Sequence, residues 1–229
     1  MKLAPFLALT AALLAGCASV SVKGLQQNGS RVTKPQHIYV APFSTSGSSF
    51  KIAGVKTGAD DTAFREKTAA VLADYTVQNV SKHVTPAAKV ASPTAAPATG
   101  WLVTGRFLRV NSGNRGMRMV IGLGAGGSKM ETAVEVFDLA VSRAKPFLAF
   151  KTTGGSNAMP GLVTSGGPGV GAAYNMLMGA TSGVTDDAAR TSRMITGALS
   201  EYYVERGWLP KQKAFKTKKP GEYQLIHGM

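Results

Sequence analysis

Hydrophobic and polar residues alternate most regularly between residues 128 and 139, where Met130, Val134 and Val136 share one face. Glu131, Ala133 and Glu135 fall on the other face, because successive side chains of a strand point to opposite sides. Three more segments rich in β-branched and aromatic residues also predict strands, and they are 37–43, 101–110 and 147–153. The pattern therefore predicts a sheet with one buried face.

Two segments repeat their apolar residues at helical spacing instead. The first runs from Asp60 to Lys82, and its adjacent Asp60 and Asp61 suit a helix start. The second begins at Thr185-Asp186-Asp187 and carries an apolar stripe at 194, 195, 198, 199, 202 and 203. Gly207 is predicted to end this helix, and Trp208 to fold back onto the core.

A long uncharged stretch lies between the last predicted strand and the last helix. From 152 to 185 there are 34 positions without a charge, and nine of them are Gly. Gly167, Gly171, Gly179 and Gly183 follow one four-residue spacing, which places small residues on one side of a helix. We expect a Gly-rich helix here, packing within the domain or between copies of the chain.

These elements together predict an α+β (or α/β) fold. We expect a single mixed, mostly antiparallel sheet of about four to five strands, two long amphipathic helices and the Gly-rich helix. Residues 87–100 are predicted to form an exposed connector.

The N-terminal segment resembles the signal of a bacterial lipoprotein. Lys2 precedes an apolar run from Leu3 to Leu14, which is shorter than the roughly 20 residues that span a bilayer. Leu-Leu-Ala-Gly then leads into Cys17, the single cysteine of the chain, and this sequence resembles the lipoprotein box. The alternative is an ordinary cleaved signal with a coincidental cysteine.

The resemblance implies a domain organisation and a location. Residues 1–16 would be the signal peptide, 17–35 a lipidated flexible tether, 36–210 the domain and 211–229 a basic tail. Cys17 would carry acyl chains that anchor the chain in a membrane. Ala18 stands where Asp retains lipoproteins in the inner membrane, so the resemblance implies the outer membrane, with the domain facing the periplasm.

The charge balance is strongly basic, with 26 Lys and Arg against 12 Asp and Glu and a net charge of +14. In a cytoplasmic protein this excess would indicate nucleic-acid binding, but an envelope location argues against it. The anions of the envelope are lipid head groups and acidic proteins. Arg106, Arg109, Arg115 and Arg118 form a candidate basic patch for them, and the alternative is a solvated face.

Several segments resemble an uncharacterised family of bacterial lipoproteins, the domain of unknown function 4410. They are the I-Y-V-A-P-F strand at 38–43, the segment G-R-F-L-R-V-N-S-G-N-R-G-M-R-M-V-I-G-L-G-A-G-G-S-K-M at 105–130, and E-V-F-D at 135–138. The family brings no activity, cofactor or catalytic residue. A looser similarity links the layout to envelope lipoproteins for transport and cell-wall assembly.

The remaining motifs do not predict catalysis. The glycines at 122–127 satisfy G-x-G-x-x-G, but the next segment alternates like a strand, whereas a dinucleotide site needs a helix there. The near match at 167–172 lacks a closely preceding strand. His37, His83 and His227 are scattered, and the Asp pairs fit helix starts better than acid–base chemistry. We therefore predict no catalytic, cofactor or metal site.

The sequence leaves three functional hypotheses in order. The first is a non-enzymatic lipoprotein of the outer membrane whose domain binds another envelope component. The second is an oligomeric transport or pore-forming lipoprotein that uses the Gly-rich segment. This hypothesis implies that the chain forms a homo-oligomer. The third is an envelope hydrolase.

Overall fold

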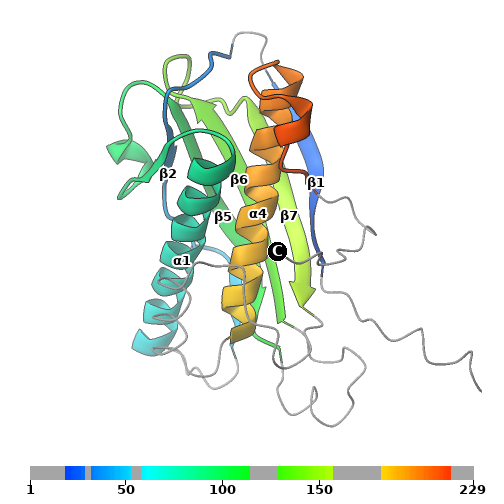
Figure 1. Cartoon of the computed structure of the whole chain (residues 1–229). Helices are drawn as coiled ribbons and strands as arrows, with labels where there is room; N and C mark the ends of the chain where they lie inside the picture. The colour runs from blue at the N-terminus through cyan, green and yellow to red at the C-terminus, as the bar shows by residue number, and fades with distance from the viewer. Residues whose placement is uncertain (1–18, 29–31, 53–57, 114–127, 157–181, 218–229) are drawn as a thin grey trace, which may run out of the picture.

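A seven-stranded sheet covered on one side by two long helices forms the described part of the protein (Figure 1). The computed structural model describes residues 19–28, 32–52, 58–113, 128–156 and 182–217. Its elements are β1 (Ser19–Gln27), β2 (Ile38–Val40), β3 (Ser49–Lys51), α1 (Ala59–His83), β4 (Ala87–Lys89), η1 (Pro93–Ala95), β5 (Trp101–Asn111), β6 (Ser128–Asp138), β7 (Leu148–Ser156), α4 (Ser182–Glu205) and η2 (Lys211–Lys213).

The sheet is mixed, with the order β1-β7-β6-β5-β2-β4 and β3 beside β5. The long strands β1, β7, β6 and β5 pair antiparallel, whereas β2, β3 and β4 pair parallel. This architecture confirms the α+β class. The predicted number of strands is too low, because β3 and β4 have only three residues each and β1 is largely polar.

Helices α1 and α4 lie side by side on one face of the sheet (Figure 1). The core fills the space between these two layers. Met130, Val134 and Val136 of β6 are buried in it, as the alternating pattern predicts. Thr132 lies in the same row of side chains and bonds to Thr152 of β7 at 2.7 Å between hydroxyl oxygens, so these two buried hydroxyls are paired with each other.

Helix α1 begins at Ala59 without a side-chain cap. Gly58 holds the cap position with φ of 110°, a backbone conformation that favours glycine. Asp60 and Asp61 were expected to cap the start, but they lie in the first turn, and Asp61 pairs with Arg65 at 2.6 Å. Their charge still suits the helix N-terminus.

Helix α4 begins at Ser182, three residues before the predicted start at Thr185. Thr185 and Asp187 are buried within the helix, so the expectation that they open it is wrong. The predicted end is confirmed, because the N–H of Gly207 bonds to the carbonyl of Val204 and that of Trp208 to the carbonyl of Tyr203. These bonds form a Schellman motif.

The N-terminal segment differs most from its prediction. Residues 19–27 form β1, an antiparallel edge strand against β7, instead of part of a flexible tether at 17–35. Val20 is buried and Val22 packs against the core, and cross-strand pairing outweighs the polar composition of the strand. Thr33, farther along the expected tether, is held by Asp138 through its N–H and its hydroxyl, each at 2.9 Å.

The segment after α4 is also attached to the domain. The predicted flexible tail at 211–229 begins with η2, and Phe215 and Thr217 dock on the helices. The ring of Phe215 lies 4.5 Å from the ring of His83, measured between centroids. The predicted connector at 87–100 similarly contains β4 and η1, and Ala96 within it is buried.

Candidate functional site: the outer face of the sheet

The face of the sheet that points away from α1 and α4 carries most of the charged side chains of the strands. We call it the outer face. Because side chains alternate along a strand, the residues between buried core positions point to this side. Its charged residues are Lys23, Lys51, Arg106, Arg109, Lys129, Glu131, Glu135 and Lys151.

A β-bulge brings Arg106 and Arg109 to the same side. Two residues three positions apart in a regular strand would face opposite ways. The pairing of β5 with β6 shifts between Phe107 and Arg109, so one extra residue is accommodated. Phe107 and Val110 therefore both face the core, and both arginines are exposed on the outer face.

Three cations lie in one row across four strands. Arg106 of β5 pairs with Ala133 of β6, Ala133 with Lys151 of β7, and Lys151 with Lys23 of β1. Directly opposite residues have Cβ atoms about 5 Å apart, and like charges there are destabilising. The three charged side chains are exposed, and the ion pairs found among the described residues do not include them. This row, Lys23–Lys151–Ala133–Arg106, is the cationic row.

One of the two acidic residues beside these cations is already paired. Glu131 lies opposite Arg109 and pairs with Lys129 at 2.9 Å, and the hydroxyl of Thr153 donates to it at 3.3 Å. Partial burial raises the pKa of Glu131, but Lys129, Arg109 and Thr153 together bring that pKa below its usual value. Glu135 is then the other acid of the outer face, and it is exposed.

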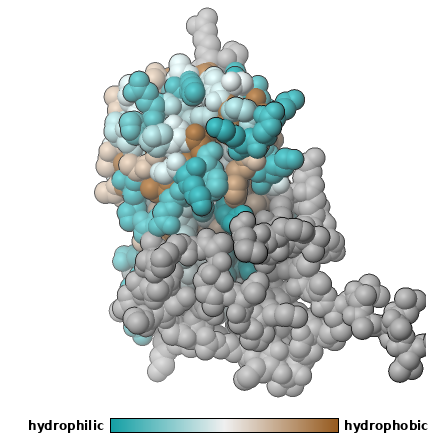
Figure 2. All heavy atoms as spheres, viewed as in Figure 1, coloured by the Kyte–Doolittle hydropathy of each residue, from teal (hydrophilic) through white to brown (hydrophobic). Residues whose placement is uncertain are grey.

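The two layers carry opposite charge. In α1 and α4, eight acidic residues stand against five Lys and Arg. The seven strands carry seven Lys and Arg against three acidic residues, and one of these cations, Lys89, reaches Asp74 of α1 at 2.6 Å. Figure 2 shows the helical side, where hydrophilic side chains cover much of the described surface. The strands are therefore net basic, mainly on the outer face, and the two helices are net acidic.

One part of the outer face is covered by the loop that contains η1. Leu102 and Phe137 pair across β5 and β6 and pack against Ala96 of this loop. Arg143 fixes the loop by donating from Nη2 to the carbonyls of Ala96 and Pro97, at 2.8 and 2.5 Å. The exposed part of the outer face is therefore the half that contains the cationic row.

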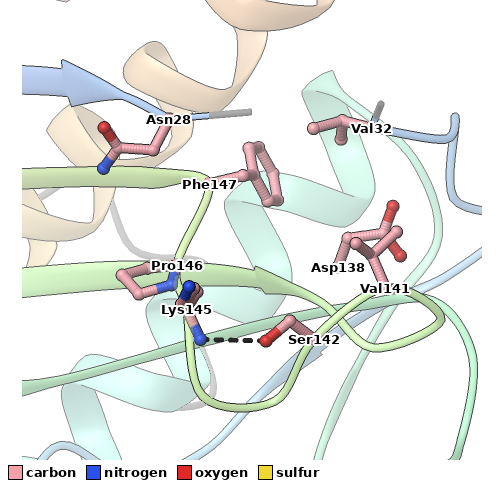
Figure 3. Close-up of a pocket in the computed structure, with 8 residues that line it drawn as sticks. All are labelled: Asn28, Val32, Asp138, Val141, Ser142, Lys145, Pro146 and Phe147. Atoms are coloured by element: carbon pink, nitrogen blue, oxygen red, sulfur yellow. Dashed lines mark hydrogen bonds between the residues drawn. The ribbon is translucent and has the colours of Figure 1, made fainter. Parts of the chain in front are cut away.

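A separate cavity of about 220 Å³ lies beside the turn between β6 and β7 (Figure 3). Its lining is mostly apolar and includes Val32, Val141 and Phe147. Asp138 also lines it, but this carboxylate already accepts hydrogen bonds from Thr33 and from the N–H of Ala140. The cavity thus lacks the converging polar groups of a ligand site.

Several predicted site residues lie outside the described residues. These are Cys17, Gly167, Gly171, Gly179, Arg115, Arg118 and the glycines at 122–127. Gly183 is buried near the start of α4, and its carbonyl accepts a hydrogen bond from the hydroxyl of Ser128 at 3.2 Å. This contact joins α4 to β6 within the domain, and the oligomer face stays a prediction.

The histidines and paired carboxylates do not assemble into a recognisable site. Within the described residues, no group of three or more His, Cys, Asp or Glu could hold a metal ion. His37 precedes β2, and His83 ends α1. Burial raises the pKa of Asp186, while Arg190 acts against that shift. Asp187 pairs with Arg190 at 3.5 Å, so both carboxylates have a structural setting in α4.

The chain matches the family model described as domain of unknown function (DUF4410) over residues 38–173, which is more than half of its length. The chain belongs to this family. The resemblance predicted from the sequence is thereby confirmed. No curated protein matches the chain.

Two solved structures are similar in outline. The PelC dodecamer from Paraburkholderia phytofirmans has 9% sequence identity and a TM-score of 0.34, covering 76% of this chain and 97% of that one. A single-substitution variant of that dodecamer in another crystal form has 10% identity and a TM-score of 0.32, covering 73% and 97%.

Sequence reasoning found two of the cations on the outer face and missed four. Lys51, Lys129, Lys151 and Lys23 come from different strands, and only the sheet register brings them beside Arg106 and Arg109. The alternation in 128–139 places Glu131 and Glu135 on one face of the strand. The same alternation also predicts Lys129 on that face. Lys23 escapes this argument, because the polar composition of 19–27 predicts a tether and not a strand.

Proposed function

We propose that this chain is a non-enzymatic, lipid-anchored lipoprotein of the outer membrane, whose domain faces the periplasm and binds an anionic component of the envelope. The anchor is supported by the Leu-Leu-Ala-Gly-Cys17 sequence after a short apolar run. None of the described helices is long and apolar enough to cross a membrane. An anchor at Cys17 would therefore hold the described domain at the surface.

The observation that carries the binding proposal is the uncompensated charge of the outer face. Arg106 and Arg109 are exposed there, and the cationic row places Lys151 directly opposite Lys23. A folded domain gains nothing internally from this like-charge pair. A bound anion would convert the repulsion into attraction, and arginine presents a planar fork of donors that suits carboxylates and phosphates.

The anchor is tested by labelling cells with a fatty-acid analogue. The native chain should be labelled, and Cys17→Ala should not be, because the chain has no other cysteine to carry a thioether-linked lipid. Cys17→Ser provides a matched control of nearly the same size. Unchanged labelling in both variants would contradict the anchor.

The binding surface is tested by crosslinking in intact cells. A photoreactive amino acid at Ala133, the centre of the cationic row, should capture an envelope component. The same group at exposed Lys67 on α1 is the control for the helical side. The combined change of Arg106→Gln and Lys151→Gln should remove the Ala133 crosslink and leave the Lys67 pattern unchanged. Turnover of an envelope polymer that depends on one Asp or His would instead indicate an enzyme.

A further inference from the structure

We propose that the outer face lies directly against the anionic head groups of the membrane that holds Cys17, with α1 and α4 turned toward the periplasm. The inference rests on the proposed function for its anchor and names the anionic component that the basic face binds. The ligand chemistry is the phosphate of anionic phospholipids arranged as a surface.

The length of chain between the anchor and the sheet is the first argument. Because β1 begins at Ser19, only Ala18 separates Cys17 from the sheet. Two residue steps span at most about 7 Å even when fully extended. This length is comparable to the head-group layer on one side of a bilayer. An acylated Cys17 would thus hold the first residue of β1 at the head groups.

The position of the charges is the second argument. Lys23 lies four residues after Ser19 on the same strand, about 13 Å along it. The attraction between lysine and an anionic surface falls off within about 8–10 Å in physiological salt. A strand standing upright on the membrane would hold Lys23 beyond this range. With the outer face laid on the membrane, the whole cationic row reaches the head groups.

The charges on the two sides of the domain are the third argument, because they decide which side faces the membrane. Helices α1 and α4 have three more acidic than basic residues, so the helices themselves repel an anionic surface. The other cations on their side, Arg206, Lys211, Lys213 and Lys216, all follow α4 in the sequence. Most of the outer face attracts the same surface, and Glu131 there is already paired with Lys129. Glu135 is the acid that opposes docking, and it lies two residues from Ala133 on β6. The sheet side is therefore the side that faces the lipid.

The test compares lysine reactivity within one intact molecule. The full chain, purified with its natural modification, is reconstituted in nanodiscs of phosphatidylcholine alone or with a third of phosphatidylglycerol, and is treated briefly with an acetylating reagent. Mass spectrometry then gives the acetylation rate of each lysine. Lys23 and Lys151 report the outer face, and exposed Lys67 and Lys82 of α1 are internal controls.

In the phosphatidylglycerol discs we expect Lys23 and Lys151 to react about fivefold more slowly than in the neutral discs. This ratio corresponds to about 1 kcal/mol per lysine near an anionic surface. Lys67 and Lys82 should react at the same rate in both, and salt near 0.5 M should remove the difference because it screens the attraction. Equal rates at Lys23 and Lys151 in the two discs would overturn the proposal.

A second measurement separates this inference from the anchor. The intact mass of the purified chain reports acylation independently, so an unmodified Cys17 refutes the proposed anchor and the membrane docking that rests on it. If the acyl chains are present and the lysines are not protected, the anchor stands and face-on docking fails. Protection of Lys23 by an acidic protein in cells, without protection in the anionic discs, would also overturn docking on lipid.

Discussion

Lys23 of β1 lies directly opposite Lys151 of β7, in the antiparallel pair that forms one edge of the sheet. Both side chains are exposed, and neither takes part in an ion pair among the described residues. The arrangement is unfavourable for the isolated domain, because like charges on facing residues repel each other. The repulsion between Lys23 and Lys151 thus destabilises the edge strand next to the proposed anchor, and a bound anion would remove this repulsion.

Replacing one of these lysines should stabilise the domain. Lys151→Glu converts the repulsion with Lys23 into attraction, and we expect a gain of about 0.5 kcal/mol, within the usual range for cross-strand pairs. For a chain of this size that is a rise in Tm of about 1–2 °C in thermal unfolding at low salt. The Tm of Lys151→Gln should lie between those of the native chain and Lys151→Glu. A lower Tm for Lys151→Glu than for Lys151→Gln would contradict the argument.

Gly105 is predicted to tolerate no side chain. A Cβ at this position would collide with the carbonyl oxygen of Ala133 and lie 2.7 Å from Cε1 of Phe43. We expect Gly105→Ala to lower the free energy of unfolding by about 3 kcal/mol, measured in denaturant, because the central strands must separate. Adding Phe43→Leu should restore little, since the backbone contact remains. A full recovery would show that the ring alone sets the limit.

Gly197 lets the segment after η2 pack closely against α4, because glycine has no side chain. A Cβ here would lie 2.9 Å from the N of Thr217 and 3.0 Å from the carbonyl carbon of Lys216. Gly197→Ala should therefore undock this segment, while the helix itself gains up to about 1 kcal/mol from alanine's higher helix propensity.

Hydrogen exchange separates these two effects of Gly197→Ala. The amides of Phe215 and Thr217, which donate to Ser200 and Glu201, should lose protection, whereas those of α4 should keep theirs. Ser200→Ala is the matched control, because it removes only the acceptor for Phe215. Retained protection at Thr217 in the glycine variant would contradict the docking.

Asp186 gives a pH dependence whose sign is fixed by its burial. Because burial raises the pKa of Asp186 in the folded state, the folded chain binds a proton more readily than the unfolded chain does. Folding stability from this group is therefore highest below its unfolded value, 3.8, and falls as pH rises through the folded pKa.

Asp186→Asn removes that ionisation. We expect its Tm to exceed that of the native chain at pH 7 and to match it near pH 3.8. Thermal unfolding of both proteins across this range provides the measurement, and Asp60→Asn in the first turn of α1 is the control. A lower Tm for Asp186→Asn at pH 7 would show that the charge is favourable at this position.

The sequence predicts those elements whose signal comes from their own residues, without a contribution from distant parts of the chain. The faces of β6 and the end of α4 at Gly207 follow from periodicity and from a cap that needs only local residues. β1 is not predicted by its sequence, because it has few apolar residues: Val20 is buried and Val22 packs against the core, but Leu25 is exposed. Its pairing partner lies more than 120 residues away, so the strand depends on tertiary contact.

The candidate site was predictable to the same extent. Arg106 and Arg109 are close in sequence, and a shared patch could be proposed without a structure. The bulge that aligns them, and the register that adds Lys151 and Lys23, are properties of the assembled sheet. Charge separation between the layers likewise required knowing which face the helices cover.

The packing of Trp208 against Trp101, with centroids 5.9 Å apart, has a spectroscopic consequence. These are the two tryptophans of the chain, and Tyr203 contacts both of them. Intrinsic fluorescence thus observes a single junction, where the end of α4 meets the start of β5. Substitutions on the outer face do not touch either tryptophan. The fluorescence of such variants therefore reports whether the helices and the sheet remain packed together.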